Sequence, residues 1–209
     1  MIVVIDYGMG NLRSVSKALE SLGAEVRVSS DPADVAKARK LILPGVGAFP
    51  AAMRELEARR LVEPIKEAVA AGRPYLGICL GLQLLFEDSE EAGGAKGLAV
   101  LPGRVRRFET NGARLKIPHM GWNQVTSNQQ SAISNQRCPL LEGIQEGSFV
   151  YFVHSYYAEP ADRSVIALES DYGGRFAAMV WRGNLFATQF HPEKSQAVGL
   201  RLLKNFIAL

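Results

Sequence analysis

The chain has 209 residues, 47% of them hydrophobic and 22% charged, which is the composition of a globular protein long enough to bury a core. Its formal net charge of +3 is too small to indicate binding to nucleic acids or to a membrane surface. The length favours a single α/β domain that spans residues 1–209. Two cysteines are too few for a disulfide framework, so we expect the protein to be in the reducing cytoplasm.

The first half of the chain alternates strand and helix signals. Ile2–Ile5 is a continuous apolar run, typical of a strand buried on both faces, and it lacks the basic segment of a signal peptide. No later apolar run is long enough to span a bilayer. A helix is predicted from the N-cap Asn11 to Leu22, followed by strands over 25–28 and 40–43. This alternation predicts βαβ units and a parallel sheet.

The next elements lead to the most informative segment. A glycine-rich loop at 44–49 precedes a helical stretch that extends to about residue 71. A short strand at 75–77 then runs through Gly-x-Cys-x-Gly, centred on Cys79, into a run that reads as a helix up to Phe86. This is the strand–turn–helix context of a nucleophile elbow, and the start of the helix favours a thiolate. The alternative is a buried structural cysteine in a turn flanked by glycines.

The second half of the chain is rich in short strands. The clearest are predicted at 149–153, 165–169, 176–181 and 185–189. The Gly183-Asn184 pair between the last two is typical of a hairpin turn. A final helix is predicted over 195–207, with core positions at Val198, Leu202, Leu203 and Phe206.

Residues 127–137 stand apart because they are polar, almost uncharged and contain Ser-Asn-Gln twice. We interpret them as a mobile surface insertion without a chemical role. Cys138 follows this segment directly and has none of the features of an elbow, so Cys79 is the candidate nucleophile.

A nucleophilic thiolate needs a base, and the base needs a group that orients it. His191 follows a predicted strand in the segment His191-Pro192-Glu193, where the carboxylate of Glu193 could fix the tautomer of the imidazole. A surface turn and a metal site are the alternatives for this segment. Because no Cys/His pair at ligand spacing accompanies it, we expect no metal and no other cofactor.

The two remaining histidines, His119 and His154, stand beside aromatic residues in apolar segments. One base is enough for the chemistry described above. We therefore predict that both are hydrogen-bonded and partly buried, and that neither is catalytic.

An acyl-transfer site also needs donors for the negative charge that develops on the substrate oxygen. The amide N–H of Leu80, directly after Cys79, is one candidate. A second is an N–H of Val46 or Gly47, in the loop after the third strand. The same loop could instead cradle a phosphate, but it lacks the Gly-Lys-Ser/Thr ending of a P-loop.

Six segments, in order along nearly the whole chain, resemble the class I (triad) glutamine amidotransferases. Two of them, the elbow and the His-Pro-Glu turn, mark the family, and the polar segment 127–137 departs from it. The first three of the other four look most like the members that supply ammonia to a cyclase in histidine biosynthesis. These four segments are Ile5-Asp6-Tyr7-Gly8-Met9-Gly10-Asn11-Leu12, Leu43-Pro44-Gly45-Val46-Gly47-Ala48-Phe49, Pro118-His119-Met120-Gly121-Trp122-Asn123 and Tyr151-Phe152-Val153-His154-Ser155-Tyr156.

The resemblance implies a flavodoxin-like α/β fold, with a central, mostly parallel sheet flanked by helices and a β-rich second half. It also implies a reaction. Cys79 attacks the side-chain amide of glutamine, His191 transfers the protons, and water then releases glutamate. Gln83, Ser155 and Tyr156 match positions that hold the glutamine in this family.

The resemblance further implies a partner, a (β/α)8-barrel cyclase subunit that receives the ammonia in a heterodimer. The candidates for the partner-facing side are Asn11, Trp122, Tyr151 and Lys194, whose alternative is an ordinary surface or core role. Glutaminase activity is expected to be low without the partner, because a peptide of the loop at 44–49 could flip and remove an oxyanion donor.

Two other functions stay open at this point. The chain could be a different triad glutaminase, or a cysteine hydrolase on the same layout, and the synthase that co-purifies with it would distinguish these. It could also be a non-catalytic interaction subunit whose Cys79 is structural or redox-active. Labelling with a glutamine-analogue electrophile separates that possibility from an enzyme.

Overall fold

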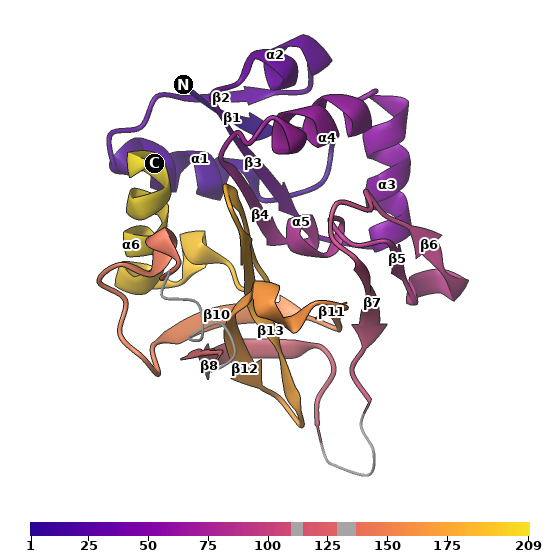
Figure 1. Ribbon diagram of the computed structural model, residues 1–209, viewed down its shortest axis with the longest axis vertical. Coiled ribbons are helices and arrows are strands. Elements are labelled where there is room, and N and C mark those ends of the chain that lie inside the picture. The colour runs from indigo at the N-terminus through magenta and orange to yellow at the C-terminus, as the bar shows by residue number, and fades with distance from the viewer. Residues whose placement is uncertain (110–114, 129–136) are drawn as a thin grey trace.

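The computed structural model describes residues 1–109, 115–128 and 137–209. Its centre is an eight-stranded sheet with the strand order β2-β1-β3-β4-β14-β13-β12-β9 (Figure 1). The first five strands in that order are parallel, and the last three continue the sheet in antiparallel pairs. Their bounds are Ile2–Ile5 (β1), Val26–Ser29 (β2), Lys40–Gly45 (β3), Tyr75–Cys79 (β4), Leu185–Thr188 (β14), Arg175–Arg182 (β13), Ile166–Asp171 (β12) and Thr126–Ser127 (β9).

Helices cover both faces of the parallel part of this sheet (Figure 1). They are α1 (Leu12–Ser21), α2 (Pro32–Lys37), α3 (Phe49–Ala58), α4 (Val62–Ala70), α5 (Leu80–Gln83) and α6 (Gln196–Ala208). In β1, Val3 and Ile5 join the core under α2, α3 and α4, whereas Ile2 and Val4 join the core under α1 and α6. Because β1 is covered on both sides, it needs a continuous apolar run. Its parallel pairing with β2 and β3 confirms the predicted α/β class and parallel sheet.

Two smaller sheets lie in the lower half of Figure 1. One pairs β8 (His119–Gln124) with β10 (Phe149–His154). The other has the order β11-β7-β5-β6, with bounds Tyr156–Pro160, Gly103–Arg107, Asp88–Ser89 and Ala95–Lys96. Short 3-10 turns complete the described elements: η1 (Glu91–Gly93), η3 (Pro139–Leu141), η4 (Arg163–Val165) and η5 (Pro192–Lys194). The β-rich second half predicted from the sequence is confirmed.

The predicted helix up to residue 71 is in fact two helices, α3 and α4. The reason is a left-handed residue, Arg60, with φ of 57°. Its N–H donates to the Glu57 oxygen, and the next N–H, of Leu61, donates to the Leu56 oxygen. This is a Schellman motif, and burial of Leu61 provides the hydrophobic contact that usually accompanies it.

Two further helix predictions need correction. The helix after Cys79 ends at Gln83 rather than near Phe86, because the oxygens of residues 84–86 accept hydrogen bonds from the N–H groups of residues 98–101. Helix α2 was not predicted, although its Asp31 cap and Pro32 were visible in the sequence. The predicted C-terminal helix is confirmed, and Leu202, Leu203 and Phe206 are buried.

The predicted mobile insertion at 127–137 lies mostly outside the described residues. Its first residue, Ser127, ends β9, and Asn128 is buried and donates to the Arg163 oxygen at 3.1 Å. No helix in the described part of the chain has both the length and the apolar character needed to cross a bilayer.

Candidate active site

The candidate site lies where the parallel strands end. In the register between β3 and β4, Gly45 stands opposite Cys79, so the glycine-rich loop and the elbow begin side by side. β14 runs parallel to β4 on its other side, and the chain after it reaches His191 two residues beyond Gln189. The carboxyl ends of parallel strands commonly form binding sites, because their loops gather at one edge of the sheet.

Cys79 has the strained backbone of a nucleophile elbow, with φ of 54° and ψ of −105°. The two neighbouring glycines make this turn possible. A Cβ atom on Gly81 would lie 1.8 Å from the Leu43 oxygen, and one on Gly77 would lie 2.6 Å from the Gly81 oxygen. Only glycine therefore lets α5 start this close to β3 and β4.

His191 and Glu193 form a buried pair. Nδ1 of His191 lies 2.8 Å from Oε1 of Glu193, and both side chains are almost fully buried. The backbone N–H of His191 donates to the Tyr151 oxygen at 3.0 Å, which fixes the base against β10. The other ring nitrogen, Nε2, has no hydrogen-bond partner in the described part of the chain and is free to serve the cysteine.

The surroundings of His191 favour its charged form. Burial alone would lower the pKa of the imidazole. The Cys79 sulfur and the Glu193 carboxylate act in the opposite direction and together raise the pKa of His191 to about 10. Cys79 and His191 thus act on each other although they are more than a hundred positions apart in sequence.

The Cys79 sulfur has two further polar neighbours. The Val153 oxygen lies 3.8 Å from Sγ, and Nε2 of Gln189 lies 3.7 Å from it. Sequence reasoning did not single out Gln189 as a site residue. Its place directly after β14 and two residues before His191 is the signal that could have identified it.

The candidate oxyanion donors follow two paired residues, because Leu80 comes directly after Cys79 and Val46 directly after Gly45. Leu80 is the first residue of α5, so its N–H has no acceptor within the helix. Val46 and Gly47 belong to the exposed loop that follows β3, and Gly47 has a left-handed φ of 97°. The far end of this loop is held by Glu91, whose carboxylate accepts from the Phe49 N–H at 2.7 Å. Sequence reasoning also missed Glu91.

The three predicted glutamine-binding residues lie close together. The side-chain amide of Gln83 donates to the Tyr156 oxygen at 2.8 Å and to Oε1 of Gln189 at 3.1 Å. Ser155 is half-buried, between β10 and β11, and its oxygen accepts from the Phe108 N–H. Gln83 thus joins the segment 155–156 to the surroundings of the sulfur.

His119 and His154 face each other across the β8–β10 pair. Nδ1 of His119 lies 3.0 Å from Nε2 of His154, and Nδ1 of His154 lies 2.8 Å from the Tyr156 oxygen. Phe108 and Phe152 pack against both rings. The prediction that both histidines are hydrogen-bonded beside aromatic residues is confirmed, and both are buried rather than partly buried.

Three of the four predicted partner-facing residues form one cluster. The Trp122 and Tyr151 rings are 6.1 Å apart at their centroids, and Nζ of Lys194 lies 5.7 Å from the Tyr151 centroid. Asn11 precedes α1 and follows β1, at the same edge of the sheet as Gly45 and Cys79. Its side chain makes no cap hydrogen bond to α1.

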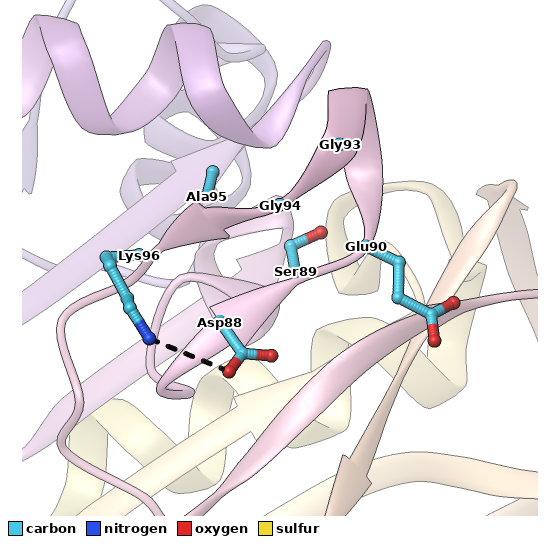
Figure 2. A pocket seen from close by; sticks show the side chains of 7 residues that line it. All are labelled: Asp88, Ser89, Glu90, Gly93, Gly94, Ala95 and Lys96. Atoms are coloured by element: carbon cyan, nitrogen blue, oxygen red, sulfur yellow. Dashed lines mark ion pairs between the residues drawn. The ribbon is translucent and has the colours of Figure 1, made fainter.

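A cavity of about 500 Å³ lies apart from these residues (Figure 2). It is lined by residues of β5, η1, β6 and the chain between them, among them Asp88, Glu90 and Lys96, and shares none with the Cys79 site. Asp88 and Lys96 form a 4.0 Å ion pair at its edge. Within the described ranges, no group of three or more His, Cys, Asp or Glu side chains is arranged to hold a metal ion.

Sequence comparisons place this chain among known proteins. The family model described as glutamine amidotransferase class-I matches residues 3–209. A protein from Syntrophotalea carbinolica, imidazole glycerol phosphate synthase subunit HisH, is 58% identical over 99% of this chain and 98% of its own length. The protein of the same name from Rhodopirellula baltica is 55% identical over 99% of this chain and 96% of its own length.

Solved structures give the same fold at low sequence identity. A crystal structure of a glutamine amidotransferase has a TM-score of 0.74 at 18% identity and covers 100% of both chains. The structure of PurLQS from Thermotoga maritima has a TM-score of 0.73 at 19% identity, covering 99% of this chain and 97% of that one. These likenesses support the architecture alone.

Proposed function

Because the chain belongs to the class-I glutamine amidotransferase family, we propose that it hydrolyses glutamine through Cys79, His191 and Glu193. We propose further that it is the glutaminase subunit of an imidazole glycerol phosphate synthase, as its HisH relatives are named. The observation that carries this proposal is the buried group in which a strained cysteine adjoins an imidazole held by a carboxylate at 2.8 Å.

The first half of the reaction forms a thioester. Sγ of Cys79, as the thiolate, attacks the side-chain carbonyl carbon of glutamine. The tetrahedral intermediate then collapses: the C–N bond breaks, His191 gives its Nε2 proton to the departing nitrogen, and ammonia leaves. The raised pKa of His191 suits this step, since the imidazolium is the form that holds the proton to be given.

The second half restores the enzyme. Neutral His191 takes a proton from water as the water oxygen attacks the thioester carbon. The C–S bond then breaks to give glutamate and the Cys79 thiolate beside the imidazolium. Glu193 keeps Nδ1 protonated throughout, so that Nε2 is the nitrogen that exchanges protons.

Charge on the substrate oxygen needs two donors at the elbow. The Leu80 N–H is free of helical acceptors, and an N–H of the Val46–Gly47 segment lies on the neighbouring strand end. Loss of one such donor typically slows catalysis by about 100- to 1000-fold. Gln83, Ser155 and Tyr156 are proposed to hold the amino-acid end of glutamine.

The proposed partner is a (β/α)8-barrel cyclase that receives the ammonia. It forms imidazole glycerol phosphate and an aminoimidazole carboxamide ribonucleotide. Support comes from the surface beside His191, where Trp122 and Tyr151 present aromatic rings and Lys194 a charge. The word subunit in the names of the relatives agrees with a multi-chain enzyme.

Labelling with a chloroketone analogue of glutamine tests the proposed chemistry. We expect one label per chain, on Cys79, with glutamine protecting against it. In His191→Ala the labelling should be about 100-fold slower, because a general base contributes a factor of this order. Cys138 is the internal control, since burial raises the pKa of its thiol to about 12. Equal labelling of both cysteines, or an unchanged rate in the variant, contradicts the proposal.

A further inference from the structure

A chain of side-chain amides connects the nucleophile to the backbone of β11. Gln189 lies between Cys79 and Gln83 and is completely buried. Its Nε2 is 3.7 Å from the Cys79 sulfur, and its Oε1 is 3.1 Å from Nε2 of Gln83. A buried polar side chain of this kind costs stability unless all its groups are satisfied, so its position beside a reactive sulfur is informative.

The direction of each hydrogen bond in this chain is determined. The Tyr156 oxygen can only accept, so the Gln83 group that faces it at 2.8 Å must be the NH2. The same NH2 faces Gln189, which must therefore present its oxygen to Gln83. The NH2 of Gln189 then has to face the sulfur. The amide orientation beside Cys79 is thus set by a backbone carbonyl two side chains away.

From this geometry we propose that Gln189 is a further catalytic residue, which donates its Nε2–H to the thiolate of Cys79. A sulfur atom that accepts a hydrogen bond is stabilised as the anion, the form that attacks the amide carbon. The neutral thiol gains less, because an uncharged sulfur is a weaker hydrogen-bond acceptor than a thiolate. Gln83 acts as the positioning residue that keeps the donor aimed.

The inference rests on Cys79 being the nucleophile of the proposed function. Besides the amide of Gln189, which does not titrate, two titratable groups act on the sulfur. They are His191, with Glu193 behind it, and Tyr7 from the chain after β1. Tyr7 stays a neutral phenol, because burial and the nearby sulfur raise its pKa. The Tyr7 hydroxyl makes no hydrogen bond in the described part of the chain, whereas the neutral amide of Gln189 donates to the sulfur, and that donor does not change with pH.

Alkylation of the cysteines by iodoacetamide measures this effect without turnover. The Cys79 peptide is quantified by mass spectrometry from pH 5 to 9, and the Cys138 peptide in the same digest reports on opening of the core. Gln189→Met keeps the length of the side chain but cannot donate. We expect its Cys79 alkylation at pH 7 to fall about tenfold, with the pH midpoint moving up by about one unit.

Two more variants sharpen the test. Gln189→Glu keeps the acceptor for Gln83 but puts a second acceptor against the sulfur, so the pH midpoint should move up at least as far. Asn205→Leu is the matched control. It also removes an amide that donates to two acceptors, but these are the oxygens of Leu140 and Glu142 rather than a group on Cys79. Its Cys79 profile should stay that of the parent.

The outcomes separate a catalytic from a structural role. A merely structural Gln189 would change the alkylation rate by one factor at every pH and leave the midpoint in place, which overturns the inference. Should both Gln189 variants misfold, NMR of the unmutated protein decides. The Gln189 side-chain amide should shift along the Cys79 alkylation profile, and an amide signal that stays constant overturns the inference. Failure of chloroketone labelling, in contrast, would count against the proposed function itself.

Discussion

The two nitrogens of His191 have different tasks, and the fold gives each a different environment. Nδ1 faces a buried carboxylate at 2.8 Å, whereas Nε2 is buried without a partner in the described part of the chain. An unsatisfied buried nitrogen costs stability. Because Cys79, which has a strained backbone, acts on the same imidazole, we interpret the unpartnered Nε2 as a group kept free for the reaction.

Glu193→Gln tests the role of the buried carboxylate. The substitution keeps the shape of the side chain but removes the negative charge that favours the imidazolium, so the pKa of His191 should fall. It also allows an amide N–H to face Nδ1, which favours the wrong tautomer. We expect glutamine hydrolysis in the presence of the proposed partner to fall by about 100- to 10 000-fold.

Glutamate formation at saturating glutamine measures this loss. Glu146→Gln is the control. It also removes a carboxylate charge, but this carboxylate accepts hydrogen bonds from Ser127 and not from the imidazole, so the rate should stay unchanged. A Glu193→Gln rate within a few-fold of the parent would show that the carboxylate is only structural.

Most residues of the candidate site were predictable because their signals are local. The elbow needs Gly77 and Gly81 around Cys79, and His191 has its orienting acid two residues away. Gln189 carries no such local signal. A glutamine becomes a donor to sulfur only when Gln83, more than a hundred positions earlier, fixes its orientation. That contact depends on β14 being placed beside β4.

At the scale of elements, the elbow depends on how closely α5 approaches the sheet. Gly81→Ala would place a Cβ atom 1.8 Å from the Leu43 oxygen, so α5 or β3 must move. We expect a loss of about 3 kcal/mol or more in the free energy of unfolding, at the upper end of overpacking effects. Urea denaturation measures it.

Gly72→Ala provides the comparison for this substitution. Gly72 has a left-handed φ of 71° and open space around it, so alanine there costs only the backbone strain, about 1 kcal/mol. A Gly81→Ala protein as stable as Gly72→Ala would mean that the close approach of α5 is not needed.

The histidine pair between β8 and β10 makes a prediction about acid pH. Burial lowers the pKa of His119 to about 4, and burial together with the neighbouring histidines lowers the pKa of His154 to about 3. In the unfolded chain these residues take up protons near pH 6.5, whereas in the folded chain they take them up only near pH 4 and pH 3. Stability from this pair is therefore complete above about pH 6.5 and is lost as the pH falls toward 4.

The urea midpoint between pH 6.5 and 5 measures this dependence. We expect it to fall with decreasing pH, and to fall less steeply in His119→Gln/His154→Gln. His191 does not interfere in this range, because its raised pKa makes it lose stability only as the pH rises above about 6.5 toward 10. An equal slope in parent and double variant would refute the assignment.

The elements themselves were predictable where one signal dominated. Ile2–Ile5 matches β1 residue for residue, because an apolar run has one solution in a covered sheet. The break at Arg60 was not predictable from its side chain, since arginine favours helices. There the backbone turns left-handed so that Leu61 can be buried, a tertiary gain that overrides propensity. The ladder between residues 84–86 and 98–101 is equally non-local.

At the scale of the whole molecule, the β8–β10 pair has one buried and one outward face. Its histidines and Phe152 point inward, whereas Met120, Trp122 and Phe149 are 66%, 46% and 53% exposed. Three large apolar side chains exposed on one small sheet are typical of an interaction surface. The same pair holds His191 through the Tyr151 oxygen, so a partner seated there would contact the strand that positions the base.

Partner dependence of glutamine hydrolysis is the prediction at this scale. The loop that carries Val46 is held at Gly45 by β3 and at Phe49 by Glu91, while residues 46–48 between them are exposed. Val46 has Gly45 before it and Gly47 after it, so a peptide group next to Val46 can turn its N–H away from the site at little cost. Since one oxyanion donor is worth about 100- to 1000-fold in rate, we expect the isolated chain to be slower than the complex by about this factor.

Titration with the proposed cyclase, in the presence of its nucleotide, measures the effect as glutamate formed per minute. The rate should rise with cyclase concentration to a plateau. Trp122→Ala should need more cyclase to reach half of the plateau, because it removes an exposed ring from the proposed contact while leaving the triad intact. Val28→Ala is the control, since Val28 is 45% exposed on β2, at the opposite edge of the sheet from β9. If the isolated chain hydrolyses glutamine as fast as the complex, the loop presents its oxyanion donor without the partner, and the proposed regulatory role of the loop is wrong.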